Sequence, residues 1–162
     1  IRAEGGEAAV CKLDAAVEED HAAAFAFAKE TYGQPVYAAH ANAGVAPLDV
    51  MLKNIEELSL AEARKVISIN QEHAMLLFMA AHSHFKENGS GVWLVTSSIA
   101  AAFPQCVFGM FPSGYHLYAN TKAAVSDMTH CFAGAYAKDN IRCYSINPGC
   151  FETKMVTDVL DA

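Results

Sequence analysis

The sequence lacks both a long apolar run and a cluster of basic residues. Its longest apolar stretch, residues 75–81, is far shorter than the roughly 20 residues that a membrane-spanning helix requires. Lys and Arg number 11 against 18 Asp and Glu, which gives a net charge of −7, and no segment concentrates the basic residues. Nucleic-acid backbones are bound by clustered Lys and Arg. We therefore expect neither a membrane span nor a nucleic-acid partner.

Metal-binding patterns of cysteine and histidine are missing as well. The chain has five cysteines, an odd number, and no Cys-x-x-Cys pair or zinc-ligand spacing occurs among them. Free thiols are typical of a reducing compartment, so the protein is predicted to be cytoplasmic and to hold no metal. The sequence begins at Ile1 rather than Met, so a targeting segment before it is compatible with what is seen. His82 and His84 face different directions on an expected helix, and we interpret them as surface or interface residues.

Short apolar runs alternate with longer helical patterns along the chain, which contains enough apolar residues for one core. We predict strands over residues 8–13, 36–41, 92–96 and 141–146, and helices over residues 15–32, 59–88 and 114–137. Residues 45–58 and 99–111 read as loops. The alternation predicts an α/β fold with a parallel sheet and right-handed crossovers.

Polar or glycine-bearing segments follow three of these predicted strands. They are Asn42-Ala43-Gly44, Ser97-Ser98 and Asn147-Pro148-Gly149. Ligands of parallel sheets bind beyond the carboxyl ends of the strands. The sequence therefore places its chemistry at one edge of the sheet.

Tyr118 and Lys122 stand four residues apart, which places them on one face of the last predicted helix. A nearby ammonium favours the phenolate and lowers the pKa of a tyrosine. At 4 Å and a surface-like dielectric the attraction is worth roughly 4 kcal/mol before desolvation. The same spacing also occurs in ordinary helices where a Lys passes a half-buried Tyr, so the pair needs its context.

Taken in order, these segments resemble the classical short-chain dehydrogenase/reductase family over nearly the whole chain. The matching positions are Asp14 after the first strand, Ala41-Asn42-Ala43-Gly44, Asn70 within the long helix, Ser98 in Thr96-Ser97-Ser98, the Tyr118-x-x-x-Lys122 motif, Asn147-Pro148-Gly149 and Thr153. The resemblance implies a Rossmann-like, doubly wound parallel sheet with helices on both faces. It also implies NAD or NADP as the cofactor.

The family assigns a role to each matching position. The resemblance implies that Asn70, Ser98, Tyr118 and Lys122 are catalytic, with Tyr118 as the general acid and base, Lys122 lowering its pKa and Asn70 holding a water. It implies that the dinucleotide is bound by Asp14, Asn42, Ala43, Gly44, Tyr118, Lys122, Pro148, Gly149 and Thr153.

Some of these positions also have simpler readings. Asp14 is equally suited to capping the following helix, and Ser98 to a turn or helix cap. Asn70 fits poorly within a helix, unless it faces solvent. Ser97 is the second candidate for the catalytic hydroxyl.

The sequence departs from the family pattern in three ways. The spacing from Ser98 to Tyr118 is longer than usual, and the extra apolar segment, 102–113, is expected to line a substrate pocket or to pack on another subunit. Ala41 replaces a polar residue. The family's Gly-rich turn, its first two strands and its last segment have no counterpart. We therefore expect residues 1–162 to be the central part of a single dinucleotide-binding oxidoreductase domain, with a sheet incomplete at both ends, and to bind dinucleotide poorly alone.

The resemblance implies an NAD(P)-dependent oxidoreductase that acts on a small carbonyl or secondary alcohol. The alternative is a non-catalytic binding or assembly module built on the same scaffold. Helices 59–88 and 114–137 resemble the paired interface helices of the family, which implies a homodimer or homotetramer.

Overall fold

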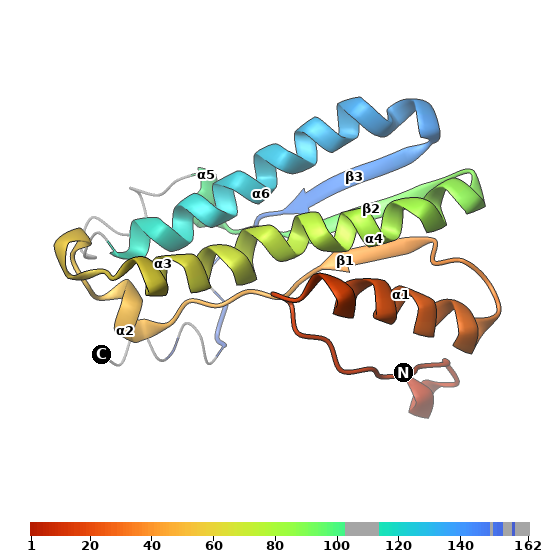
Figure 1. Ribbon diagram of the computed structural model, residues 1–162, viewed down its shortest axis with the longest axis horizontal. Helices are drawn as coiled ribbons and strands as arrows, with labels where there is room; N and C mark the ends of the chain where they lie inside the picture. Colours follow the sequence, from red (N-terminus) through yellow and green to blue (C-terminus); the bar gives the residue numbers. More distant parts are fainter. Residues whose placement is uncertain (103–113, 150, 154–156, 158–162) are drawn as a thin grey trace.

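The computed structural model describes residues 1–102, 114–149, 151–153 and 157. Its centre is a sheet of three strands, β1 (Ala38–Ala41), β2 (Gly91–Thr96) and β3 (Ile141–Ile146), in the order β1-β2-β3 (Figure 1). Both strand pairs are parallel, with Ala41 opposite Val95 and Val95 opposite Ser145. The predicted parallel α/β sheet is confirmed, and three of its four predicted strands are present.

Three long helical segments accompany the sheet. They are α1 (Glu18–Tyr32), the run formed by α3 (Leu60–Ile67), η3 (Ser68–Glu72) and α4 (His73–Asn88), and α6 (Gly114–Tyr136). Shorter helical elements are η1 (Arg2–Glu4), α2 (Leu48–Met51), η2 (Ile55–Glu57), α5 (Ile99–Ala102) and η4 (Ala137–Asp139). No helix in the described ranges is long and apolar enough to cross a bilayer.

The boundaries of the middle segment follow from its sequence. Ser59 Oγ accepts a hydrogen bond from the Glu62 amide, and the Glu62 carboxylate accepts one in return from the Ser59 amide, as a capping box requires. Gly89, at a φ of 69°, ends α4 in the left-handed conformation that glycine adopts without strain. Between these ends the helix is not uniform, because η3 is a π-helical segment. The predicted helix 59–88 is therefore correct in extent and wrong in its regularity.

The strand predicted over residues 8–13 is wrong. These residues are not paired with any described strand, and Val10 is 92% exposed. A short apolar run becomes a strand only when a neighbouring strand satisfies its backbone hydrogen bonds, and no described strand lies beside this one. Residues 45–58, expected to be a loop, contain the short elements α2 and η2. Of the segment 102–113, residues 103–113, which include the expected cap Ser113, lie outside the described residues.

The described helices cover one face of the sheet. The connection from β1 to β2 and the connection from β2 to β3 both move one strand along the sheet in the same direction. Because such connections are right-handed, α4 and α6 lie on the same face of the sheet, and α1 lies beside α4 (Figure 1). Trp93 and Val95 of β2 are buried there against Phe78 and Phe85 of α4. On the other face Tyr144 is 51% exposed. The second helix layer of a doubly wound sheet is not among the residues that the structure describes.

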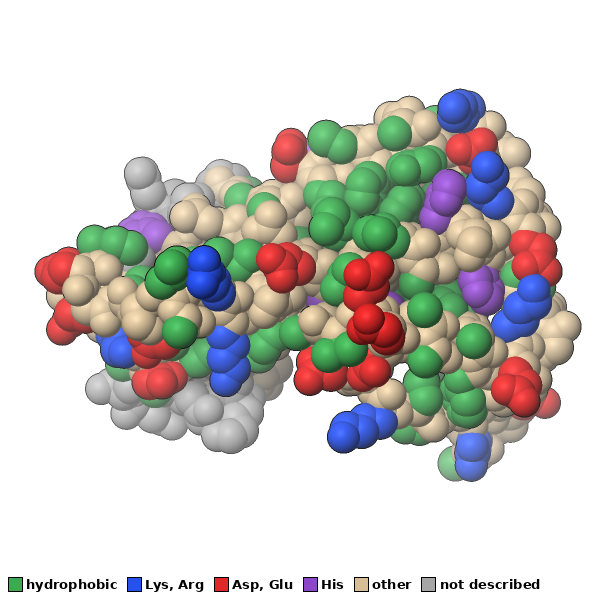
Figure 2. Space-filling view, in the orientation of Figure 1, with side chains coloured by type: hydrophobic (Ala, Val, Ile, Leu, Met, Phe, Trp, Pro, Cys, Tyr) green, Lys and Arg blue, Asp and Glu red, His purple; other side chains and the backbone are tan. Residues whose placement is uncertain are grey.

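The first half of α4 exposes apolar side chains. Met75 and Met79 are 45% and 56% exposed, whereas Phe78 and Ala81 of the same helix are buried in the core. Figure 2 shows apolar side chains gathered over α4 and α6 on this side of the molecule. One side of the apolar stretch 75–81 is therefore buried in the core, and the other side is exposed.

Candidate active site

Lys122 is the most deeply buried charged group at the carboxyl edge of the sheet. Its side chain projects from α6, the residue is 4% exposed, and Nζ donates a hydrogen bond of 2.8 Å to the main-chain oxygen of Thr96. Nζ also lies 5.8 Å from the centre of the Tyr118 ring, one turn earlier on the same helix. Burial lowers the pKa of the Lys122 ammonium to about 8, because the charged form loses its hydration.

Two opposing effects act on the pKa of Tyr118. Burial raises the pKa of the Tyr118 phenol and the side-chain hydrogen bond with Ser98 lowers it, and the net direction is upward. The expectation that Lys122 lowers this pKa is therefore wrong for the chain as described. The ammonium donates its hydrogen bond to Thr96 rather than to the phenol, and desolvation of the phenolate outweighs the hydrogen bond with Ser98. Tyr118 consequently keeps its proton at neutral pH.

The two consecutive serines after β2 have different surroundings. Ser97 is 2% exposed, donates a hydrogen bond of 2.7 Å to the Lys122 carbonyl oxygen and accepts one of 2.8 Å from Ser126. Ser98 is the serine that reaches Tyr118, and its Oγ also accepts a hydrogen bond from the Ala100 amide at the start of α5. Ser97 thus anchors the sheet to α6, while Ser98 combines the predicted contact with Tyr118 and the alternative role of a turn hydroxyl.

Asn70 lies in the π-helical segment and is 1% exposed, so the solvent-facing alternative is wrong. Its Oδ1 accepts a hydrogen bond of 2.7 Å from the Val45 amide, and its Nδ2 donates to the Val45 carbonyl oxygen and to Thr121 Oγ1. Both polar atoms are therefore satisfied, which an Asn inside a regular helix rarely achieves. π-Helical turns often mark functional positions. Here the turn lets one side chain join the loop after β1 to α6.

Gly44 leaves room for the Lys122 ammonium. A Cβ built at Gly44 would lie 3.0 Å from Lys122 Nζ and 3.5 Å from Asn70 Oδ1. A Cβ at residue 44 would crowd the end of the Lys122 side chain, so glycine lets the loop backbone lie close to the ammonium. The result is a cradle formed by Gly44, Asn70 and Lys122 beside Tyr118.

The loops after the three strands meet at one edge, as predicted. Asn42 Oδ1 accepts a hydrogen bond of 2.8 Å from Thr96 Oγ1, which joins the loop after β1 to the end of β2. The Ile99 amide donates to the Pro148 carbonyl oxygen at 2.9 Å, which joins the end of β2 to the loop after β3. Ala43 and Gly149 are exposed in these loops.

Asp14 and Thr153 are not brought into contact with this group. Asp14 Oδ1 accepts a hydrogen bond from the Ala16 amide in the turn before α1, but the N-cap of α1 is Val17 and no side chain caps the helix, so the capping alternative for Asp14 is wrong. The contact of Asp14 with a dinucleotide stays a prediction. Thr153 is exposed, and its carbonyl oxygen accepts a hydrogen bond from the Thr157 amide.

Two residues of the site were not predicted from the sequence. Thr96 accepts the Lys122 ammonium through its main-chain oxygen, and Thr121 Oγ1 accepts from Asn70 and donates to the Tyr118 carbonyl oxygen at 2.7 Å. Thr121 immediately precedes Lys122, and Thr96 is the last residue of β2. Their positions next to predicted site residues were the available signals.

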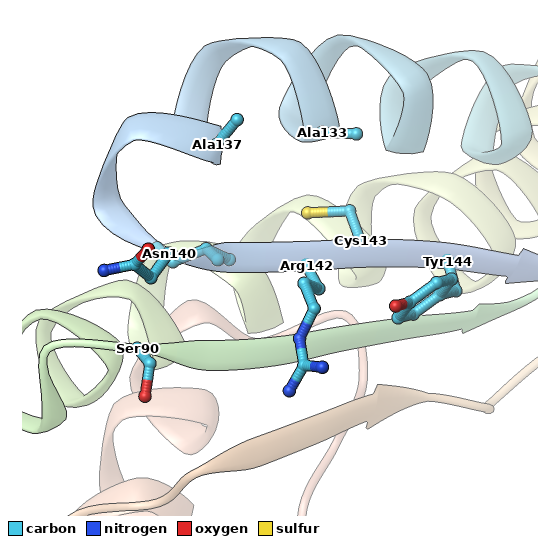
Figure 3. A pocket seen from close by; sticks show the side chains of 8 residues that line it. Ser90, Ala133, Ala137, Asn140, Arg142, Cys143 and Tyr144 are labelled. Carbon is cyan, nitrogen blue, oxygen red and sulfur yellow. The ribbon is translucent and has the colours of Figure 1, made fainter.

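A surface hollow elsewhere does not belong to this site. It lies at the amino end of β3 and is lined by residues that include Asn140, Arg142 and Cys143. In Figure 3 Cys143 points toward α6, whereas Arg142 and Tyr144 point to the opposite side of β3. The chemistry gathers at the carboxyl ends of the strands, so this hollow reflects the open edge of β3. Within the described ranges, no cluster of three His, Cys, Asp or Glu side chains is arranged to hold a metal.

Two buried histidines lie behind the site. His21 and His73 are 1% and 3% exposed, and their ring centres are 6.2 Å apart. The Nδ1 atom of each ring has no hydrogen-bond partner among the described residues. Burial lowers the pKa of His73 from 6.5 to about 4, and the positive charges of His21 and Lys122 act in the same direction.

We expect His73 to make the protein less stable in acid. Between pH values of about 6.5 and 4 the unfolded chain binds more protons at this residue than the folded chain does, so the free energy of unfolding falls as pH falls. The loss should reach up to about 3 kcal/mol, and His73→Leu should flatten the slope in this range. Urea unfolding at a series of pH values measures it, with His130→Leu on the exposed side of α6 as the matched control. An unchanged slope in His73→Leu would contradict this account.

The chain is similar to known proteins over its whole length. A family model described as enoyl-(acyl carrier protein) reductase matches residues 1–162. Cyclohexanol dehydrogenase from Acinetobacter sp. is 31% identical over 163 residues, which cover 100% of this chain and 60% of that protein.

Two solved structures of oxidoreductases are also similar to most of this chain. The 3-ketoacyl-(acyl-carrier-protein) reductase from Brucella melitensis, complexed with NADH, matches with a TM-score of 0.83 and 28% identity, over 98% of this chain and 63% of that one. An alcohol dehydrogenase from Thermococcus sibiricus, complexed with 5-hydroxy-NADP, matches with a TM-score of 0.76 and 26% identity, over 94% of this chain and 58% of that one. The chain thus spans about 60% of the length of the proteins that it matches.

Proposed function

The chain belongs to the short-chain dehydrogenase/reductase family, and from that premise we propose that the complete protein is an NAD- or NADP-dependent oxidoreductase. It would transfer a hydride between the nicotinamide and a small carbonyl or secondary alcohol. The observation that carries the proposal is the grouping of Ser98, Tyr118 and Lys122 at the carboxyl edge of the sheet. Ser98 is hydrogen-bonded to Tyr118, and Lys122 Nζ lies 5.8 Å from the centre of the Tyr118 ring. The NADH and 5-hydroxy-NADP complexes of the two matching structures support the cofactor class.

The residues present fit a dinucleotide. The cradle of Gly44, Asn70 and Lys122 places a buried cation beside backbone that a Cβ would fill, which suits an oxygen-rich ligand. Lys122 and Asn42 would donate to cofactor oxygens there, with Ala43, Pro148 and Gly149 exposing backbone in the adjoining loops. When bound, the cofactor supplies or accepts the hydride. Asp14 and Thr153 remain proposed contacts at its two ends.

The chain's own part in the reaction is to move a proton and to hold charge. In the reductive direction the substrate oxygen gains negative charge, and Tyr118 Oη donates the proton that converts it to an alcohol. Its raised pKa keeps that proton in place at neutral pH. Ser98 Oγ supplies a second hydrogen bond to the same oxygen. In the oxidative direction Tyr118 takes the proton back.

Lys122 and Asn70 support this step from behind. The ammonium of Lys122, 5.8 Å from the centre of the Tyr118 ring, would hold a cofactor oxygen beside the phenol. Asn70 joins the Val45 loop to α6 through three hydrogen bonds, two with Val45 and one with Thr121. Thr121 in turn donates a hydrogen bond to the Tyr118 carbonyl oxygen. A water held near Asn70, as the family implies, would resupply the proton from solvent.

The two serines provide a matched test. Ser98→Ala should lower kcat by about 10²-fold or more with little change in stability, because it removes a donor to the developing oxyanion. Ser97→Ala should lower the free energy of unfolding by about 1–3 kcal/mol, because it breaks a buried link between β2 and α6, with a smaller effect on kcat. Steady-state kinetics and urea unfolding separate the two. An equal effect of both substitutions on kcat would count against the assignment of Ser98.

Assembly and location complete the proposal. The exposed Met75 and Met79 on α4 support a homodimer or homotetramer formed through this helix face. Cys11, Cys131 and Cys143 are free among the described residues, which supports the cytoplasmic location, and Cys106 and Cys150 lie outside them. The exposed Met pair suits an assembly module as well, so the catalytic tests decide between the two functions. The matching proteins act on different substrates, so the substrate is proposed only as a small carbonyl or secondary alcohol.

A further inference from the structure

Three side chains form a hydrogen-bonded chain on the open face of the sheet. His40 Nε2 lies 2.8 Å from Thr96 Oγ1, and Thr96 Oγ1 donates to Asn42 Oδ1 at 2.8 Å. His40 and Asn42 are two residues apart, so they point to the same face of the sheet. Ala41 pairs with Val95, which places Thr96 beside Asn42 on the neighbouring strand. The topology thus sets a titratable side chain two hydrogen bonds away from a proposed cofactor contact.

The direction of the hydrogen bonds follows from the number of protons. The Thr96 hydroxyl has one hydrogen, and it is directed at Asn42 Oδ1. His40 Nε2 must therefore donate to Thr96 Oγ1. This order occupies the oxygen of the Asn42 amide and turns both N–H bonds away from Thr96. An Asn whose N–H groups face away in this manner is set to donate to an acceptor oxygen at the sheet edge.

Thr96 links this chain to the catalytic group. Its main-chain oxygen accepts the Lys122 ammonium at 2.8 Å, while its side chain holds Asn42. One residue therefore places two proposed cofactor contacts relative to each other. His40 lies on the sheet face that the described helices leave open, outside the described hydrophobic core.

We propose that His40 is a positioning residue for the dinucleotide. By donating to Thr96 it orients the hydroxyl toward Asn42, and Asn42 is then aligned to donate to an oxygen of the bound cofactor. The role rests on the proposed function, because it requires a dinucleotide at this edge. It adds a specific residue and a specific hydrogen-bond direction to that function.

The test is dinucleotide binding to variants of the complete protein, measured by calorimetry with NADH and NADPH. His40→Leu and Thr96→Val should each raise the Kd of the preferred dinucleotide by about fivefold to tenfold, because each breaks the chain that orients Asn42. The double variant should bind no more weakly than either single variant, since both act on one network. His40→Gln should restore binding to within about twofold, because its terminal amide donates from nearly the same position as Nε2.

Kinetics and a control distinguish positioning from general damage. At saturating cofactor, kcat of His40→Leu should stay close to that of the wild type, with the change confined to the KM for cofactor. Tyr144→Leu, on the same open face but outside the chain, should leave the Kd unchanged. An unchanged Kd in His40→Leu, additive effects in the double variant or no rescue by His40→Gln would overturn the positioning role alone. A wild-type protein that binds neither dinucleotide would overturn the proposed function, and this inference with it.

Discussion

Replacing Tyr118 with Phe should lower kcat by about 10²- to 10⁴-fold, the usual worth of a positioned proton donor. The change removes one oxygen and keeps the ring that packs in the apolar cluster with Tyr115 and Ala119. The Kd for the dinucleotide should stay within about threefold of the wild type, because Phe can still occupy the Tyr118 site. Steady-state kinetics with both nicotinamide cofactors, together with calorimetry, measure the two quantities separately.

Tyr144→Phe is the control for this experiment. It removes the same atom from a tyrosine that lies exposed on β3, away from Ser98 and Lys122. Its kcat should equal that of the wild type. If Tyr118→Phe kept a comparable rate, Tyr118 would not be the proton donor, and the roles assigned to its neighbours would lose their basis.

Replacing Lys122 with Met should have the second largest effect, a fall in kcat/KM of about 10²-fold or more. Met keeps most of the volume of the buried side chain and removes its charge. Stability should change far less, by about 2 kcal/mol at most. The variant loses the hydrogen bond to the Thr96 oxygen, but it also loses the cost of burying an ammonium.

The pH dependence of stability identifies the buried ammonium. In the folded chain burial lowers the pKa of Lys122 from 10.5 to about 8. Between these values the unfolded chain binds more protons, so this residue makes the free energy of unfolding rise with pH. Lys122→Met should lack that rise in urea unfolding between pH values of about 8 and 10.5. Identical slopes in wild type and variant would show that Lys122 is not desolvated as described.

The local parts of the fold were readable from the sequence. The strands near 36–41, 92–96 and 141–146 were recognisable because apolar runs end at polar turn residues, and Gly33 and Gly89 marked two helix ends. The run 8–13 has the same local appearance, but its state depends on a neighbouring strand that no described residue provides. The π-helical segment at Ser68–Glu72 could not be predicted from the sequence either. It contains Asn70, whose hydrogen bonds are to residues far away in the sequence.

The grouping of the candidate side chains could be predicted from the sequence, but their pKa values could not. The order of the strands placed Ser98, Tyr118 and Lys122 at one edge, and the family resemblance selected them. The spacing of Tyr118 and Lys122 did not reveal that burial would raise the tyrosine pKa, because desolvation depends on the packing around α6. Likewise, the links through Thr96, Thr121 and His40 join different strands and helices, and a linear pattern does not contain them.

The most direct measurement is a single turnover of the complete protein, loaded with reduced nicotinamide dinucleotide and mixed with a panel of cyclic and acyl ketones. The wild type should consume the reduced nicotinamide, more slowly in heavy water because Tyr118 transfers a proton, and Tyr118→Phe should leave it intact while still binding it. Consumption at equal rates by both proteins would contradict the account. So would a wild type that binds the dinucleotide and reduces none of the ketones.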